Sequence, residues 1–209
     1  MHERFVAGCH IRAWLLACLL ALDAAAAVAA TEPTAQLKAS VDRVIAILED
    51  PSLKTAPRAP ERSAAVRKVT DDIFDFDEIA QRSLARHWRT LTNDQRREFV
   101  HLFADLLERS YMSKIELYSG EPIQYTGERV DGDLATVTTK LITKNGTEVP
   151  IDYRMLKRGD RWLVFDVVIE GVSLVGNYRT QFNTIIQTAS YAELVKKIRA
   201  RVEELRAPR

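Results

Sequence analysis

Residues 133–156, DLATVTTKLITKNGTEVPIDYRML, contain two runs of alternating side chains joined by Asn145-Gly146. Asn-Gly is the strongest short signal for a tight turn between antiparallel strands, because the favoured turn needs positive φ at both central positions. After the turn, apolar or aromatic side chains occupy every second position, as in a strand with one buried face. These side chains are Val149, Ile151, Tyr153 and Met155. The segment therefore predicts a β-hairpin.

Two further strands are predicted on either side of this hairpin. Residues 122–130, PIQYTGERV, precede it and end at Asp131-Gly132, a turn signal. Residues 161–170, RWLVFDVVIE, follow it after a turn at residues 158–160. Short turns between consecutive strands indicate an antiparallel meander. The sequence thus predicts a four-stranded antiparallel sheet.

Apolar residues recur at helical spacing before and after the strands. The longest predicted helix spans about residues 94–118, and Thr92 with Gln95 has capping-box spacing at its start. Helices before the strands followed by helices after them predict an α+β fold, with residues 31–209 forming one domain. The other predicted helices cover residues 34–49, 61–74, 75–88, 178–189 and 191–205.

Residues 1–30 have the features of a secretory signal peptide. Two arginines precede a short apolar run, and small residues then allow cleavage after Ala29 or Ala30. The run is shorter than the roughly 20 apolar residues of a transmembrane helix. We therefore expect an exported chain, from which cleavage removes both cysteines.

Ser173 lies between two glycines in the segment GVSLVG, residues 171–176, which resembles the nucleophile elbow of hydrolases. That elbow requires glycine two residues after the serine, where this chain has Val175. The histidines outside the predicted signal peptide, His87 and His101, both precede Ser173, although the order of such residues varies between folds. We expect Ser173 to bond backbone or a neighbouring side chain, and we expect no enzyme activity.

The sequence offers no signal for a cofactor, a metal or a nucleic acid. The histidine spacing matches no common zinc motif, and no glycine-rich phosphate loop is present. The net charge is +1, with basic residues spread among acidic ones. What remains is the apolar face of the sheet and the long helix, which forms either ordinary core or a cavity for a hydrophobic ligand.

Two segments resemble the MlaC family, also known as toluene-tolerance auxiliary proteins. Residues 74–88, FDFDEIAQRSLARHW, show the family's Phe-x-Phe, and the resemblance extends over about residues 35–205. Residues 162–182 show its W-x-x-x-D-x-x-x-E-G-V-S run. Here that run is formed by Trp162, Asp166, Glu170, Gly171, Val172 and Ser173.

The resemblance implies a soluble periplasmic carrier of phospholipid with an α+β fold, in which acyl chains enter a pocket between sheet and helices. Its implied partners are an outer-membrane lipoprotein complex and an inner-membrane ABC transporter with an MCE-type ring. The related HpnM branch makes hopanoid or another polycyclic lipid the alternative cargo. The residues also leave open a lipid hydrolase that uses Ser173 and an adaptor without a pocket.

For the pocket wall we predict eleven side chains from the sheet and the later helices, with ordinary core as the alternative for each. They are Phe103, Leu107, Tyr111, Ile115, Val137, Leu141, Ile151, Tyr153, Phe165, Val167 and Tyr178. We also predict that Glu170 and Arg179 pair across the turn that contains Gly171, because an unpaired charge is costly where it is partly buried.

Overall fold

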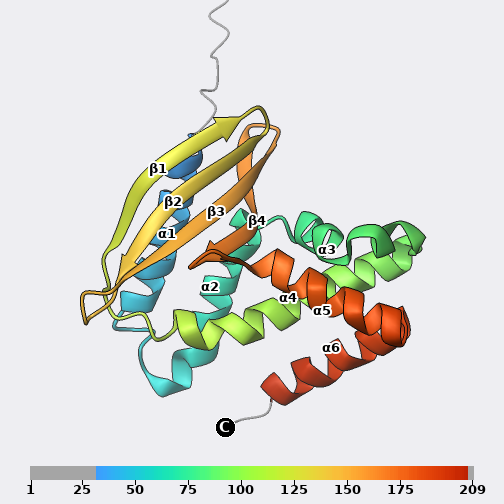
Figure 1. Ribbon diagram of the computed structural model, residues 1–209. Coiled ribbons are helices and arrows are strands. Elements are labelled where there is room, and N and C mark those ends of the chain that lie inside the picture. Colours follow the sequence, from blue (N-terminus) through green and yellow to red (C-terminus); the bar gives the residue numbers. More distant parts are fainter. Residues whose placement is uncertain (1–31, 207–209) are drawn as a thin grey trace, which may run out of the picture.

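The computed structural model describes residues 32–206, so the predicted signal peptide lies outside the described residues. Five antiparallel strands form one sheet in the order β1-β2-β3-β4-β5 (Figure 1). The strands β1 to β4 form the predicted meander, which together with the surrounding helices confirms the α+β class. The five strands span Ile123–Asp131, Leu134–Ile142, Glu148–Arg158, Arg161–Ile169 and Val172–Ser173.

The fifth strand was not predicted, so the expectation of four strands was wrong. Glu170 and Gly171 have φ values of 51° and 80°, and the chain reverses within these two residues. Val172 and Ser173 then pair with the end of β4. A strand of two residues is too short to show alternation, which explains why the sequence pattern did not reveal it.

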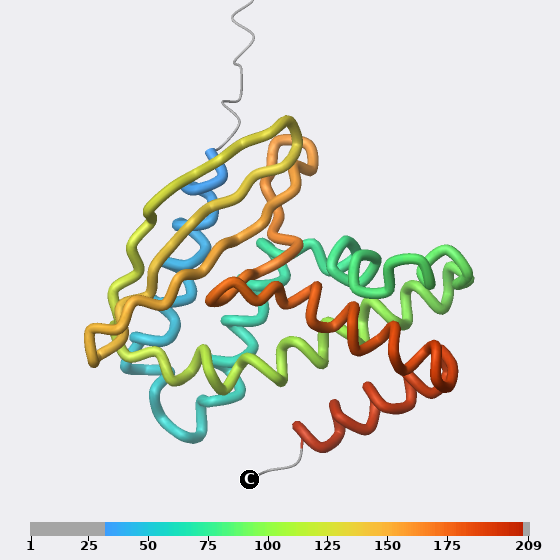
Figure 2. The backbone as a smooth tube through the Cα atoms, viewed as in Figure 1, coloured from blue at the N-terminus to red at the C-terminus, as the bar shows by residue number. Residues whose placement is uncertain are grey.

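The helices form two groups beside the sheet. Helices α1 and α2 lie along one face of the sheet, whereas α3, α5 and α6 cluster beyond its β4 side (Figure 1). Helix α4 runs out of that cluster toward α1 and α2, as the trace in Figure 2 also shows. The helices α1 to α6 span Pro33–Glu49, Ala59–Ile73, Phe76–Leu84, Asn93–Ile115, Leu174–Thr188 and Tyr191–Arg206, and two short 3-10 turns, η1 and η2, span Ala56–Arg58 and Ala85–Thr90.

Helix α4 begins with the predicted capping box. Thr92 Oγ1 accepts a hydrogen bond from Gln95 N at 3.3 Å, and Gln95 Oε1 accepts one from Thr92 N at 2.9 Å. The α-helix ends at Ile115, earlier than the predicted residue 118. The next turn tightens, because Tyr118 N donates to Ile115 O, three residues back.

Two hydrophobic cores lie on either side of strand β4. One is between the sheet and helices α1 and α2, and contains Val164. The other is among helices α3 to α6, and contains Phe165. Val164 and Phe165 can serve opposite cores because successive side chains of a strand point to opposite faces. A β-bulge also lies here: Arg154 pairs with Asp166 and Met155 with Val164, which leaves Phe165 as the extra residue.

We predict that Thr92→Ala lowers the free energy of unfolding by about 1 kcal/mol, because the first turn of α4 loses its cap. Chemical denaturation monitored by circular dichroism measures this change. Thr92→Ser is the matched control and should change stability much less, since it keeps the hydroxyl. Equal losses in both variants would show that the cap is not the cause.

Candidate functional site

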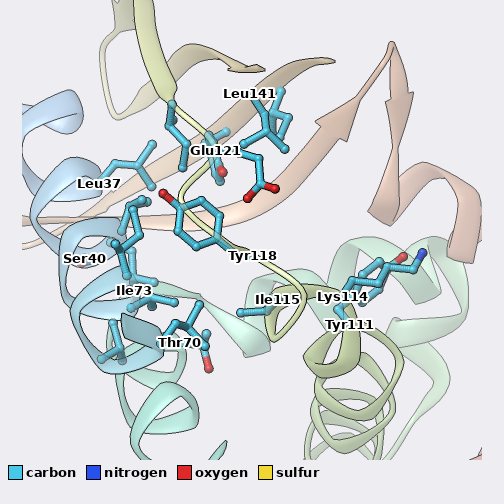
Figure 3. Close-up of a pocket in the computed structure, with 18 of the residues that line it drawn as sticks. Leu37, Ser40, Thr70, Ile73, Tyr111, Lys114, Ile115, Tyr118, Glu121 and Leu141 are labelled. Carbon is cyan, nitrogen blue, oxygen red and sulfur yellow. The ribbon is translucent and has the colours of Figure 1, made fainter. Parts of the chain in front are cut away.

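A cavity of about 540 Å³ lies between the sheet and helices α1, α2 and α4 (Figure 3). This volume falls within the roughly 300–1,000 Å³ typical of small-molecule sites. Nearly all of the wall is hydrocarbon, and α1 supplies one complete stripe of it. That stripe consists of Leu37, Val41, Val44, Ile45 and Leu48.

A second cavity, of about 260 Å³, adjoins the first on the side of β4 and α4. Its additional wall is also mostly apolar, and includes Leu107, Phe165 and Val167. Six side chains line both cavities, so the two form neighbouring parts of one apolar region. The shared residues are Thr70, Phe74, Tyr111, Ile115, Tyr153 and Ile169.

The larger cavity opens to solvent near the end of α4, where the lining residue Leu117 is 77% exposed. Lys114 and Glu121 bring one charge of each sign to the lining, and Figure 3 shows them well apart. The Lys114 ammonium lies 5.4 Å from the centre of the Tyr111 ring. Hydrogen bonds from Ser119 hold the pKa of Glu121 below its usual value. The charges of this cavity therefore lie beside its opening.

The second cavity has an ion pair at its edge. Arg67 lies 2.9 Å from Glu108 Oε2, although this contact lacks the alignment of a good hydrogen bond. Burial raises the pKa of Glu108, and the Arg67 charge opposes that change. In the wall between the two cavities, burial raises the pKa of Tyr153 to about 12, so this phenol stays neutral at physiological pH.

Eight of the eleven predicted wall residues line these cavities. They are Leu107, Tyr111, Ile115, Leu141, Ile151, Tyr153, Phe165 and Val167. Their contact with a lipid remains a prediction.

The other three predicted residues line neither cavity. Phe103 and Tyr178 pack edge to face in the core of helices, with ring centres 4.9 Å apart. Val137 is fully buried in the core between the sheet and α1. Phe103 lies in core and Tyr111 lines a cavity because the first half of α4 packs against the helical cluster. Only the later turns of α4 reach the cavities. A single apolar stripe on α4 does not show this change of surroundings.

The contribution of α1 and α2 to the wall was not predicted from the sequence. Val44, Ile45 and Val69 line the larger cavity, and none was among the predicted wall residues. Their spacing is visible as an apolar helical stripe, but a stripe that faces core and one that faces a cavity have the same pattern. Only the distance between the layers distinguishes the two, and the sequence does not give that distance directly.

Ser173 forms hydrogen bonds with Asp166 and with the start of helix α5. Its Oγ donates to Asp166 Oδ2 at 2.6 Å and accepts from Gly176 N at 2.8 Å, which caps helix α5. Asp166 is 4% exposed and also accepts from Val175 N at 3.0 Å. His87, by contrast, contacts Asn183. The expectation that Ser173 bonds backbone or a neighbouring side chain is therefore confirmed.

The predicted ion pair between Glu170 and Arg179 does not form. Both side chains are described and exposed, and no contact within ion-pair distance joins them. The turn is instead ordered by Asp166, whose carboxylate also pairs with Arg154 at 3.1 Å. This buried acid, four residues before Glu170, takes the role that was predicted for Glu170.

Within residues 32–206, no cluster of three or more histidine, cysteine or acidic side chains is arranged to hold a metal ion. In the same range, no helix is both long and apolar enough to cross a membrane.

An α+β domain with open apolar cavities between its sheet and its helices defines a class of domain suited to holding a hydrophobic ligand. Residues 38–200 match the family described as MlaC protein. The chain belongs to the MlaC family.

Two relatives and one solved structure support this assignment. The intermembrane phospholipid transport system binding protein MlaC of Haemophilus influenzae is 22% identical over 177 residues, which cover 82% of this chain and 83% of the relative. The toluene tolerance protein ttg2D of Pseudomonas putida is 25% identical over 125 residues, covering 59% of this chain and 58% of ttg2D.

The solved structure is that of a phospholipid-binding protein from Ralstonia solanacearum in complex with a phospholipid. It is similar to this structure with a TM-score of 0.74 and 26% sequence identity, over 85% of this chain and 100% of that chain. The two chains therefore share the fold over nearly the whole described domain.

We predict that Ser173→Ala lowers the free energy of unfolding by about 1–3 kcal/mol, because it removes a helix cap and leaves Asp166 short of one donor. Ser190→Ala is a matched control, since Ser190 Oγ also caps a helix by accepting from Glu193 N at 3.1 Å. Its loss should be smaller, about 1 kcal/mol. Urea denaturation measures both, and a smaller effect at Ser173 than at Ser190 would contradict the role given to Asp166.

Proposed function

We propose that this protein is a carrier that binds a diacyl phospholipid and transports it between membranes. The observation that carries the proposal is the pair of adjoining apolar cavities, of about 540 Å³ and 260 Å³, between the sheet and helices α1, α2 and α4. In this arrangement the acyl chains occupy the cavities and the head group stays at the opening near Lys114 and Glu121.

The energetics of a lipid suit such a site. Each CH₂ removed from water contributes about 0.8 kcal/mol, so the acyl chains supply the driving force without any specific polar contact. Because the side chains shared by the two cavities carry no charge, and only Thr70, Tyr111 and Tyr153 among them bear a hydroxyl, this wall selects for apolar chains rather than for a particular head group. A carrier of this kind needs no buried charge to hold its cargo.

The relatives support phospholipid as the cargo, since one is named for phospholipid transport and another was solved with a phospholipid bound. We further propose that the chain works in the periplasm. Its proposed partners are an outer-membrane lipoprotein complex and an inner-membrane ABC transporter with an MCE-type ring. Hopanoid remains the alternative cargo, and lipid analysis distinguishes the two.

We also propose that the protein is not an enzyme. The Ser173 hydroxyl already bonds Asp166 and caps the start of α5. His87 contacts Asn183 rather than this serine. If a purified sample hydrolyses phospholipid or a p-nitrophenyl ester, and Ser173→Ala abolishes that hydrolysis, the protein is a hydrolase instead.

The proposal predicts that the exported chain, purified without detergent, carries lipid. Organic extraction followed by mass spectrometry should detect about one diacyl phospholipid per protein, a stoichiometry expected for one apolar region of this size. A hopanoid in its place would identify the alternative cargo. Folded protein without any lipid would contradict the carrier and favour the adaptor without a pocket.

A charged variant tests the location of the lipid. We predict that Ile115→Glu reduces the co-purified lipid about tenfold or more, because Ile115 lines both cavities and an unpaired carboxylate disfavours an acyl chain there. Val130→Glu is the control, since Val130 is 48% exposed on β1 and lines neither cavity. Circular dichroism shows whether both variants are folded, and equal lipid content in the two would place the lipid elsewhere.

A further inference from the structure

A separate polar pocket of about 400 Å³ lies between helix α3, the 3-10 turn η2, strand β4 and the start of α5. Four arginines line it, from four different elements, whereas only two carboxylates do so. The arginines are Arg82 on α3, Arg89 on η2, Arg154 on β3 and Arg179 on α5. We refer to it as the arginine pocket.

Both carboxylates of the arginine pocket already have partners. Asp166 accepts bonds from Arg154 at 3.1 Å, from Ser173 Oγ and from a backbone N–H of α5. Glu78 pairs with Arg82 at 2.7 Å and with Arg158 at 3.0 Å. Neither acid is therefore available to neutralise the remaining two arginines.

Arg89 and Arg179 are both exposed, and neither has a carboxylate of residues 32–206 within ion-pair distance. They reach the pocket from two different elements, η2 and α5. Val175 and Gly176, in the first turn of α5, also line it, and their N–H groups already bond Asp166 and Ser173. The two guanidinium groups are therefore the unneutralised charges of the pocket.

Flat apolar surface completes the arginine pocket. Trp88 lines it beside Arg89, and Phe165 lines it beneath the guanidinium of Arg82, which lies 4.1 Å from the centre of the Phe165 ring. The aromatic contact holds Arg82 in place before any ligand arrives. The pocket thus combines one arginine held against an aromatic ring, two unneutralised arginines and two aromatic side chains in its wall.

We propose that the arginine pocket is a binding site for an oxyanion, a phosphate or a carboxylate group. Guanidinium groups present paired N–H donors that match both groups, and two unneutralised arginines provide such donors from two directions. The site differs from the lipid-binding region in its lining, because it shares only Phe165 and Asp166 with the second apolar cavity and four arginines line it. It stands independently of the proposed carrier function.

Titration calorimetry of the exported chain with inorganic phosphate and with succinate tests this site. The variant with Arg89→Gln and Arg179→Gln should bind either anion about tenfold more weakly or worse, which corresponds to a loss of about 1.4 kcal/mol or more for the two guanidinium groups together. Arg129→Gln is the matched control, because Arg129 is exposed on β1, outside the pocket. It should leave binding unchanged.

A second assay separates the two sources of the anion. Sedimentation with phosphatidylglycerol vesicles, compared with phosphatidylcholine vesicles, detects recognition of an anionic lipid head group. Binding of free phosphate or succinate that depends on the two arginines identifies a soluble anion. Binding of anionic vesicles alone, if it also depends on the two arginines, identifies a lipid head group as the ligand. Either result supports the site.

The proposal is overturned if the wild-type chain binds neither the free anions nor the anionic vesicles. It is also overturned if the double variant and Arg129→Gln bind equally. The lipid content measured by mass spectrometry is a separate readout, expected to be the same in all three proteins. Failure of the arginine pocket is therefore distinguishable from failure of the carrier function.

Discussion

The arrangement of sheet and helices depends on hydrogen bonds between strand β4 and the helices around it. The Gln36 side chain on α1 bonds both the N–H and the carbonyl of Trp162, at 2.9 and 2.6 Å. Further along the same strand, Val164 O accepts from Asp75 N at the start of α3. Asp166 then holds the start of α5. Because these hydrogen bonds hold the helices near their ends, the helices keep their positions relative to the sheet. Side chains then need not fill all of the space between sheet and helices.

Strand β4 contributes to two cores, because its successive side chains point to opposite faces of the sheet. Val164 faces the core under α1 and α2, and Phe165 faces the core of the helical cluster and the second cavity. Helix α4 changes its surroundings in the same way along its length, with Phe103 in the helical core and Tyr111 beside both cavities. The apolar region thus lies between the two cores, and members of both line it, such as Ile73 and Leu107. An unfilled apolar space is destabilising in itself, so a bound acyl chain would restore the contacts that are absent.

Local signals in the sequence predicted most strands and helices. They failed to separate core from cavity, because that difference depends on the distance between the sheet and the helices. Turn residues and alternation located β1 to β4, and the Thr92 capping box located the start of α4, because these signals act within a few residues. The short strand β5 and the Asp166 contacts depend on how the chain folds back, so the prediction that Glu170 orders the turn was wrong. Apolar stripes identified buried faces correctly, yet they could not tell core at Val137 from cavity at Val44. The eight wall residues that line the cavities lie where the meander and the later turns of α4 face each other.

The central claim is that acyl chains lie between the sheet and helices α1, α2 and α4. A crystal structure of residues 31–209, purified without detergent, tests it most directly. We predict continuous electron density for acyl chains beside Val44, Ile115 and Tyr153, with the head group near Lys114. Well-ordered protein in which α1 and α4 close onto the sheet, with no density between them, would contradict it.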